Sequence, residues 1–251
     1  MRCFNCHREL TSDTLEVCPS CGVYLTAEKK DLLHPGHTLQ NGRYILGPIL
    51  GRSSFGVTYQ ARHEFLGRDV AIKEYFPQEF CKRVKAIQPL QVPDVNAASY
   101  QKGLDLFMRE SRLIAHLRHP NVVSVDDYFS ENGTAYVVME LLGSRNLRTE
   151  LNASRGSLAS VRVQQLGEQL ISALGAAHAM GLYHLDITPE HILITETGPK
   201  LANFAFSRIQ AGHTRGGAQK PAPYAAPEVL INGQAGPWTD IFSLAMCMCV
   251  G

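Results

Sequence analysis

The sequence predicts an α+β protein in which a small cysteine-rich segment precedes a β-rich half and then a helical half. Two Cys-x-x-Cys pairs stand near the start, and three β-rich runs follow between Tyr44 and Phe76. Apolar residues then recur at helical spacing in the stretches 104–117 and 166–178. With 251 residues and 45% apolar content, the chain is large enough for one medium domain and a small appendage.

Net charge and hydropathy argue against membrane and general nucleic-acid ligands. A formal net charge of +1 gives no general attraction to nucleic acid or to an anionic membrane. No stretch approaches the roughly 18 uncharged apolar residues of a membrane span, and the N-terminus has no apolar signal core. We therefore expect a folded cytoplasmic protein with no membrane ligand and no general nucleic-acid ligand. The charge balance does not identify the partner; the expected protein partner or substrate follows from the motifs described below.

The cysteine pairs predict a structural zinc ribbon. Two thiolates from each Cys-x-x-Cys pair can occupy adjacent corners of a tetrahedron, and eleven residues separate the pairs. Too few apolar residues lie nearby to build a core, so the metal would supply most of the folding free energy. Two disulfides or a redox pair are the alternatives. The expected ligands are Cys3, Cys6, Cys18 and Cys21.

Domain boundaries follow from composition. The stretch from Lys29 to Gln40 contains Pro35 and Gly36 and shows little periodicity, which is typical of a linker. Basic and acidic side chains balance within the ribbon, which favours a structural or protein-contact module. The expected parts are a zinc ribbon at 1–28, a linker at 29–42 and the main domain at 43–251.

A buried charge pair is expected within the main domain. In the third β-rich run, the two-residue period places Ala71 and Lys73 on one face, although a strand lysine is often simply solvated. In the following helix, Glu110 falls on the apolar stripe of Phe107 and Ile114. Burying that carboxylate alone would cost several kcal/mol, so Lys73 is its natural partner unless Glu110 reaches solvent from the edge of the stripe.

These motifs together resemble the N-lobe of a protein kinase, most closely the bacterial Hanks-type serine/threonine kinases. The resemblance rests on the loop GRSSFGV, on VAIK, on the helix glutamate and on HPNVV. It implies that the loop covers ATP, that Lys73 and Glu110 grip the phosphates, and that AYVVMELLG forms the gatekeeper and hinge. Ser53 replaces the family's middle glycine, which predicts a weaker phosphate grip. The implied nucleotide-binding residues are Gly51, Ser53, Gly56, Val57, Ala71, Lys73, Glu110, Met139, Glu140, Leu142 and Leu193.

The segment HLDITPEH resembles the kinase catalytic loop, which makes Asp186 the implied catalytic base. Leu185 replaces the arginine that meets a phosphorylated activation loop, and Thr188 replaces the lysine that stabilises the transferring phosphoryl group. Activation through the arginine contact is therefore not expected.

Two further positions are altered where the family holds magnesium. His191 replaces an asparagine, and imidazole is a poor ligand for a hard cation that prefers oxygen. Asn203 replaces the metal-binding aspartate and offers only a neutral oxygen. Losing about 4 kcal/mol of metal stabilisation would slow transfer about a thousandfold.

The fold implied by the resemblance is two-lobed and protein kinase-like, with a β-rich N-lobe at about 43–142 and a helical C-lobe at about 143–251 that is truncated after its central helix. PYAAPEVL resembles the end of an activation segment, and Asp240 in the next helix is expected to brace the catalytic loop. The sequence stops inside that helix, which predicts a fragment or a chain completed by another polypeptide. The expected exposed apolar face comprises Ile241, Leu244, Met246 and Met248.

Three functions remain open from the sequence. The preferred one is a nucleotide-binding pseudokinase that acts as a scaffold or switch, with structural zinc, ATP and doubtful magnesium. The second is a slow, genuine serine/threonine kinase that uses Asp186. The third is a zinc-ribbon adaptor in which the kinase fold is purely structural.

Overall fold

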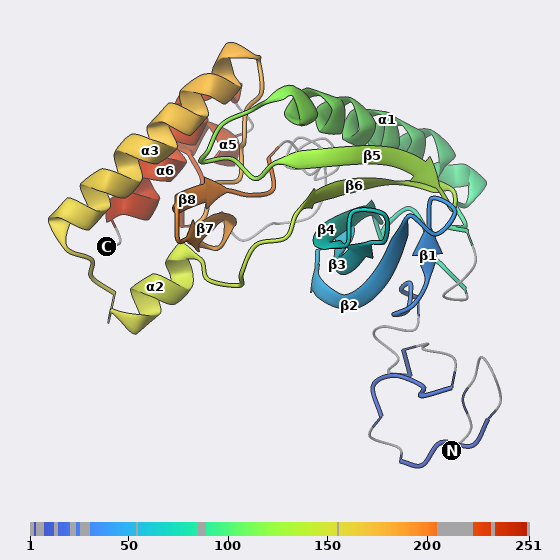
Figure 1. The fold of residues 1–251 in the computed structure, drawn as a ribbon. Coiled ribbons are helices and arrows are strands. Elements are labelled where there is room, and N and C mark those ends of the chain that lie inside the picture. The colour runs from blue at the N-terminus through green and yellow to red at the C-terminus, as the bar shows by residue number, and fades with distance from the viewer. Residues whose placement is uncertain are drawn as a thin grey trace. The chain divides into compact units, whose positions relative to one another are not determined.

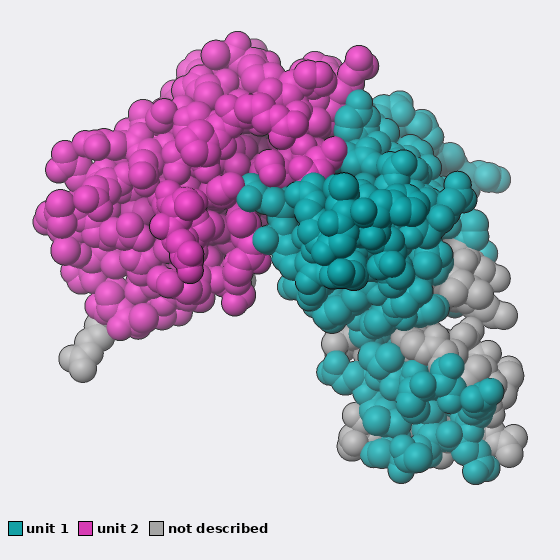
Figure 2. Space-filling model, in the orientation of Figure 1, with its two compact units in different colours: residues 1–108, 127–141 teal, residues 109–126, 142–251 magenta. Residues whose placement is uncertain are grey.

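The computed structural model describes residues 3, 8–12, 15–20, 24–25, 31–53, 55–84, 89–154, 156–204, 223–231 and 234–249. The chain divides into two compact units, which Figure 2 shows in different colours. Unit 1 comprises residues 1–108 and 127–141, and unit 2 comprises residues 109–126 and 142–251.

Unit 1 is built on a six-stranded sheet in the order β1-β2-β3-β4-β6-β5, which Figure 1 shows as a curled layer. The β-rich runs expected from the sequence form β2, β3 and β4, and adjacent members of this trio are antiparallel. The strands are β1 (Thr38–Leu39), β2 (Tyr44–Arg52), β3 (Gly56–His63), β4 (Arg68–Tyr75), β5 (Val125–Glu131) and β6 (Thr134–Glu140). Helix α1 (Asp94–His116) connects β4 to β5.

Part of the predicted linker packs as part of unit 1. Strand β1 pairs antiparallel with β2, and Leu32 and Leu33 are almost completely buried. The Leu33 amide donates a hydrogen bond to the Tyr59 hydroxyl at 3.3 Å. Burial of two leucines gives this stretch a hydrophobic anchor of a few kcal/mol on the sheet.

The N-terminal cysteine segment forms a small cluster of its own. Cys3 and Cys18 are buried and pack together with Leu10 and Leu25. Cys6 and Cys21 lie outside the described residues, and among the described residues no group of three His, Cys, Asp or Glu side chains is arranged to hold a metal ion. Two buried thiols in one cluster fit half of the predicted ligand set, so zinc stays a prediction.

Helix α1 carries the apolar stripe that the sequence predicts. Phe107 and Ile114 of the helix and Leu117 directly after it are buried, and Glu110 is completely buried. The alternative in which Glu110 reaches solvent from the edge of the stripe is therefore wrong. A fully buried carboxylate requires compensating charge or hydrogen bonds.

Unit 2 is mainly helical. Its long helix α3 buries Leu166, Leu170 and Leu174, as the predicted stripe requires, and packs against α6. A short two-stranded sheet pairs β7 with β8 antiparallel. The elements are α2 (Leu147–Ala153), α3 (Ser160–Ala179), the 3₁₀ helix η1 (Pro189–His191), β7 (Ile192–Thr195), β8 (Gly198–Leu201), α5 (Pro227–Leu230) and α6 (Pro237–Cys249). None of the helices in the described ranges has the length and apolarity needed to cross a membrane.

The apolar face expected on α6 is only partly exposed. Ile241 is 44% exposed, as predicted, whereas Leu244 is only 3% exposed. The prediction for Leu244 is wrong because α6 packs against α3 and the helical period turns Leu244 inward together with Cys247. Met246 and Met248 are half-buried.

Candidate functional site

The glycine-containing turn between β2 and β3 is held by its own hydrogen bonds. The Ser53 amide donates to the Gly56 carbonyl at 2.8 Å, and the Phe55 amide donates to the Ser53 hydroxyl at 3.4 Å. The Ser53 hydroxyl in turn donates to the Gly56 carbonyl at 3.2 Å. The side chain that replaces the family's middle glycine therefore hydrogen-bonds back into the turn, so the hydroxyl contributes to the order of the turn.

Glycine is required at position 56 by the close approach of β3 and β4. A Cβ atom on Gly56 would lie 2.5 Å from the Glu74 carbonyl oxygen, which belongs to the backbone of the neighbouring strand. It would also lie 3.6 Å from Cε of Lys73, so the lysine side chain passes beside this glycine. Gly51, by contrast, has open space where a Cβ would be.

We expect Gly56→Ala to destabilise the protein by about 1–3 kcal/mol, because the β3–β4 pair must spread to admit the methyl group. Gly51→Ala, in β2 just before the turn, is the matched control and should change the free energy of unfolding by less than about 0.5 kcal/mol. Urea unfolding of both variants measures the difference. Equal stabilities would contradict the close approach.

Strand β4 presents Ala71 and Lys73 as predicted. Both residues are buried, and the antiparallel pairings place Lys73 opposite Thr58 of β3 and Val137 of β6. Ala71 lies opposite Met139, the predicted gatekeeper. A lysine this deeply buried is not the ordinary solvated strand residue that the sequence left open.

The remaining nucleotide-binding predictions divide between the units. Val57 is buried in β3, and Glu140 is half-buried at the end of β6, both in unit 1. Leu142 and Leu193, which are half-buried, and Glu110 belong to unit 2. The pairing of Lys73 with Glu110 joins residues of different units and stays a prediction.

Asp186 lies in the loop before η1 in unit 2, next to a residue with a strained backbone. Leu185 has φ +62°, a left-handed conformation that costs a non-glycine residue about 1–2 kcal/mol. The buried Asp240 carboxylate maintains it, accepting hydrogen bonds from the His184 amide at 2.8 Å and the Leu185 amide at 2.7 Å. His178 adds a contact to the same carboxylate at 2.8 Å. The predicted bracing of this loop by Asp240 is confirmed.

His184 completes the support of this loop as a neutral side chain. Its Nδ1 accepts a hydrogen bond from the Asp186 amide at 3.3 Å, and its Nε2 donates to the Ala202 carbonyl at 2.8 Å. Complete burial lowers the pKa of His184 to about 4, against the attraction of Asp240. An uncharged imidazole fits one accepted and one donated hydrogen bond.

His191 is hydrogen-bonded to Asp186, the predicted catalytic base. Its Nδ1 donates to the Asp186 backbone carbonyl at 2.7 Å and lies 3.5 Å from the Asp186 carboxylate oxygen Oδ2. Only Nε2 of the ring is left for any other ligand. Asn203 also adopts a left-handed backbone, φ +62°, which asparagine tolerates better than most residues.

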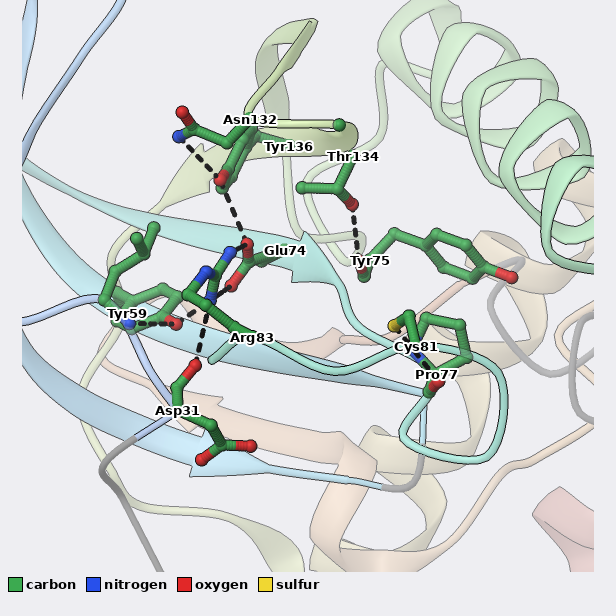
Figure 3. Close-up of polar contacts among 12 residues, drawn as sticks. Asp31, Tyr59, Glu74, Tyr75, Pro77, Cys81, Arg83, Asn132, Thr134 and Tyr136 are labelled. Atoms are coloured by element: carbon green, nitrogen blue, oxygen red, sulfur yellow. Dashed lines mark hydrogen bonds and ion pairs between the residues drawn. The ribbon is translucent and has the colours of Figure 1, made fainter. Parts of the chain in front are cut away.

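A buried ionic cluster in unit 1 escaped the sequence analysis. Figure 3 shows Glu74 at its centre: Arg83 Nη2 contacts Oε1 at 2.5 Å, and the hydroxyls of Tyr59 and Tyr136 donate to the same carboxylate at 2.9 and 3.0 Å. Burial opposes the guanidinium charge, but the attraction of Glu74 outweighs it and raises the pKa of Arg83. Burial, reinforced by Glu74, also raises the pKa of both tyrosines, so they remain hydrogen-bond donors.

A second missed contact lies in unit 2, where Arg148 of α2 joins the segment after Asp186 to PYAAPE. Its Nε meets the Glu190 carboxylate at 2.8 Å, and its Nη2 donates to the Tyr224 hydroxyl at 2.8 Å. Residues 76 positions apart in the sequence meet here, which no local pattern signals.

Comparison with known protein families matches residues 44–250 to the protein kinase domain. This range covers most of the chain and includes every motif between the glycine turn and α6. The chain belongs to the protein kinase family.

Its curated relatives include serine/threonine-protein kinases. It is 33% identical over 219 residues to Serine/threonine-protein kinase PknA of Mycobacterium tuberculosis (strain ATCC 25618 / H37Rv), covering 82% of this chain and 46% of that protein. It is 32% identical over 224 residues to CBL-interacting protein kinase 19 of Oryza sativa subsp. japonica, covering 86% of this chain and 40% of the relative. The kinase chain thus spans less than half the length of these relatives.

A solved structure described as the PpkA-294 apo form shares the fold. Its TM-score is 0.71 with 27% sequence identity, and the match covers 85% of this chain and 76% of that one. The two-lobed kinase-like architecture expected from the sequence is thereby supported for the kinase part of the chain.

The three described positions predicted to lie around magnesium, 186, 191 and 203, do not fit magnesium held in the manner of this kinase family. Position 191 offers an imidazole nitrogen where a hard cation prefers oxygen, and its Nδ1 already binds the Asp186 carbonyl. Position 203 offers a neutral amide. Asp186 alone supplies a carboxylate among these three positions, and its side chain is about one-third exposed.

Proposed function

We propose that this chain is a nucleotide-binding pseudokinase that acts as a scaffold or switch, with strongly impaired phosphotransfer. The observation that carries the proposal is His191, which stands where the kinase motif has its metal-binding asparagine and whose Nδ1 is hydrogen-bonded to the Asp186 carbonyl. Magnesium stabilisation of the transferring phosphoryl group is worth several kcal/mol, and no oxygen at position 191 replaces it.

Nucleotide binding is supported by the retained residues of unit 1. Lys73 is buried beside Gly56, and Ala71 lies across from Met139 on the neighbouring strand, as a flat base over a small side chain requires. The ammonium of Lys73 is a suitable hydrogen-bond donor to the oxygens of nucleotide phosphates.

A slow, genuine kinase is the second candidate, and the geometry around Asp186 favours it. The loop carrying Asp186 is held by Asp240 and His184 in spite of the strain at Leu185. Strained backbone that is maintained by several partners is common at sites that position a reacting group. In this case Asp186 would accept the hydroxyl proton of a protein substrate.

Thermal unfolding with ATP, in magnesium and in EDTA, tests the proposal. ATP at a hundredfold excess over its Kd should stabilise the protein by about 2.7 kcal/mol, which corresponds to a rise in Tm of roughly 5–10 °C. The pseudokinase predicts similar shifts in magnesium and in EDTA, and Lys73→Met should remove both. A shift that requires magnesium, together with radiolabelled transfer abolished by Asp186→Ala, would establish the kinase instead.

No shift under either condition would favour the adaptor, in which the ribbon alone is active. The proposal includes a protein partner, a cytoplasmic location and structural zinc bound by the four ribbon cysteines. Buried Cys3 and Cys18 in one cluster support the zinc assignment.

A further inference from the structure

An ion pair links Arg52, beside the turn at Ser53, to Asp31 of the predicted linker. This turn is the one predicted to cover the nucleotide phosphates. Arg52, the last residue of β2, stands directly before Ser53 of the turn. Its Nη2 lies 2.9 Å from Oδ2 of Asp31, and its Nη1 lies 3.3 Å from Oδ1. The two side chains are only 27% and 26% exposed, and a two-pronged contact fixes the orientation of the arginine as well as its position.

Asp31 is itself held by the buried ionic cluster, so it provides a fixed point. Its backbone carbonyl accepts a hydrogen bond from Nη1 of Arg83 at 3.1 Å, as Figure 3 shows. Arg83 is completely buried against Glu74, and Leu33, two residues after Asp31, is completely buried as well. The carbonyl of Asp31 therefore faces the core while its carboxylate holds the end of β2.

The segment that follows β4 also forms hydrogen bonds with this turn. Gln78 donates through Nε2 to the Ser53 carbonyl at 3.1 Å, and the Phe76 amide donates to the Phe55 carbonyl at 2.9 Å. The Phe76 ring also lies near both guanidinium groups, with centroid distances of 5.7 Å to Arg52 and 5.4 Å to Arg83. The position of Arg52 is thus coupled to the core cluster through both Asp31 and Phe76.

We propose that Asp31 is a positioning residue for nucleotide phosphates: by holding Arg52 it fixes the turn at Ser53 in the order that phosphate binding requires. The inference rests on the proposed nucleotide binding. The predicted ribbon also contacts the strand that leads into the turn, because the Tyr24 hydroxyl accepts a hydrogen bond from the Ile49 amide of β2 at 3.2 Å. A partner that displaces the N-terminal segment would loosen the turn.

The full chain carrying Asp31→Asn tests the role, because the amide keeps the backbone carbonyl and the size of the side chain. The measurement is the Kd of ATP and, separately, of adenosine, in EDTA. We expect ATP to bind about threefold to fivefold more weakly while the adenosine Kd stays unchanged, since only ATP has phosphates under the turn. Hydrogen exchange should be faster in the segment 49–60 of the variant without any nucleotide.

Asp69→Asn is the matched control. It removes a carboxylate from an ion pair with Arg62, whose atoms are 3.5 Å apart and whose side chains are about half exposed (54% and 48%), at the far end of the β3–β4 pair. This variant should leave both affinities and the exchange rates unchanged.

Three outcomes would overturn the positioning role. Equal loss of ATP and adenosine affinity would mean that Asp31 acts only on overall stability. Unchanged ATP affinity and exchange in Asp31→Asn, with ATP bound by the wild type, would refute the inference and leave the proposed function intact. A wild-type chain that binds no ATP would refute both.

Discussion

Replacing Arg83 with methionine is expected to lower the free energy of unfolding by about 3–5 kcal/mol. The variant leaves the fully buried Glu74 carboxylate with two tyrosine donors and without its cation. It also removes the hydrogen bond to the Asp31 carbonyl. Because a domain of this kind has only about 5–15 kcal/mol of total stability, the variant should lose a large part of it. Urea unfolding followed by circular dichroism measures the change.

The charge itself can be separated from packing by a double variant. Glu74→Gln combined with Arg83→Met removes both charges and should recover a substantial part of the loss, because the buried unpaired anion is then absent. Arg62→Met is the surface control and should cost less than about 1 kcal/mol, since Arg62 is 54% exposed. An Arg83→Met variant as stable as the surface control would contradict the buried ion pair.

The buried cluster around Glu74 was not predicted from the sequence, although the period of its strand was. The two-residue period along β4 correctly placed Ala71 and Lys73, and the same period puts Glu74 on the opposite face. That face is buried against Tyr59 and Tyr136, so a carboxylate there needs a cation. Arg83 supplies it from an irregular segment nine residues later, where no period signals burial.

The N-terminal connection was missed for a related reason. Leu32 and Leu33 are adjacent apolar residues, and strand β1 is only two residues long, so neither produces a detectable period. Strand β1 pairs with β2 and the Leu33 amide donates to Tyr59 of β3, and such contacts follow from the folded sheet rather than from local sequence. The bond between Asp31 and Arg52 spans 21 positions and is equally invisible locally.

The loop around Asp186 was more predictable because its motif is concentrated in a few residues. The motif predicted the bracing role of Asp240, and the hydrogen bonds from the His184 and Leu185 amides confirm it, whereas the role of Asp186 as catalytic base stays a prediction. The sequence also identified His191 as altered. It could not reveal that the ring is bound through Nδ1 to the Asp186 carbonyl, because side-chain orientation is set by the folded loop.

Restoring oxygen ligands at the two altered positions is expected to produce the largest functional change. In the double variant His191→Asn, Asn203→Asp, the amide nitrogen introduced at position 191 can donate to the Asp186 carbonyl as the imidazole Nδ1 does now, while the amide oxygen remains available to a hard cation. Aspartate also tolerates the left-handed backbone of position 203, φ +62°, so the second substitution adds charge with little strain.

If the missing metal stabilisation is worth about 4 kcal/mol, the double variant should transfer phosphate about a thousandfold faster than the wild type in magnesium. Radiolabelled ATP measures the transfer, and ATP should then raise Tm more in magnesium than in EDTA. Adding Asp186→Ala should abolish the gain, and His191→Gln is the size-matched control, since its longer side chain places the amide oxygen differently. A double variant with metal-independent ATP binding and no transfer would show that the impairment lies elsewhere, with Thr188 in place of the phosphoryl-stabilising lysine as the next position to restore.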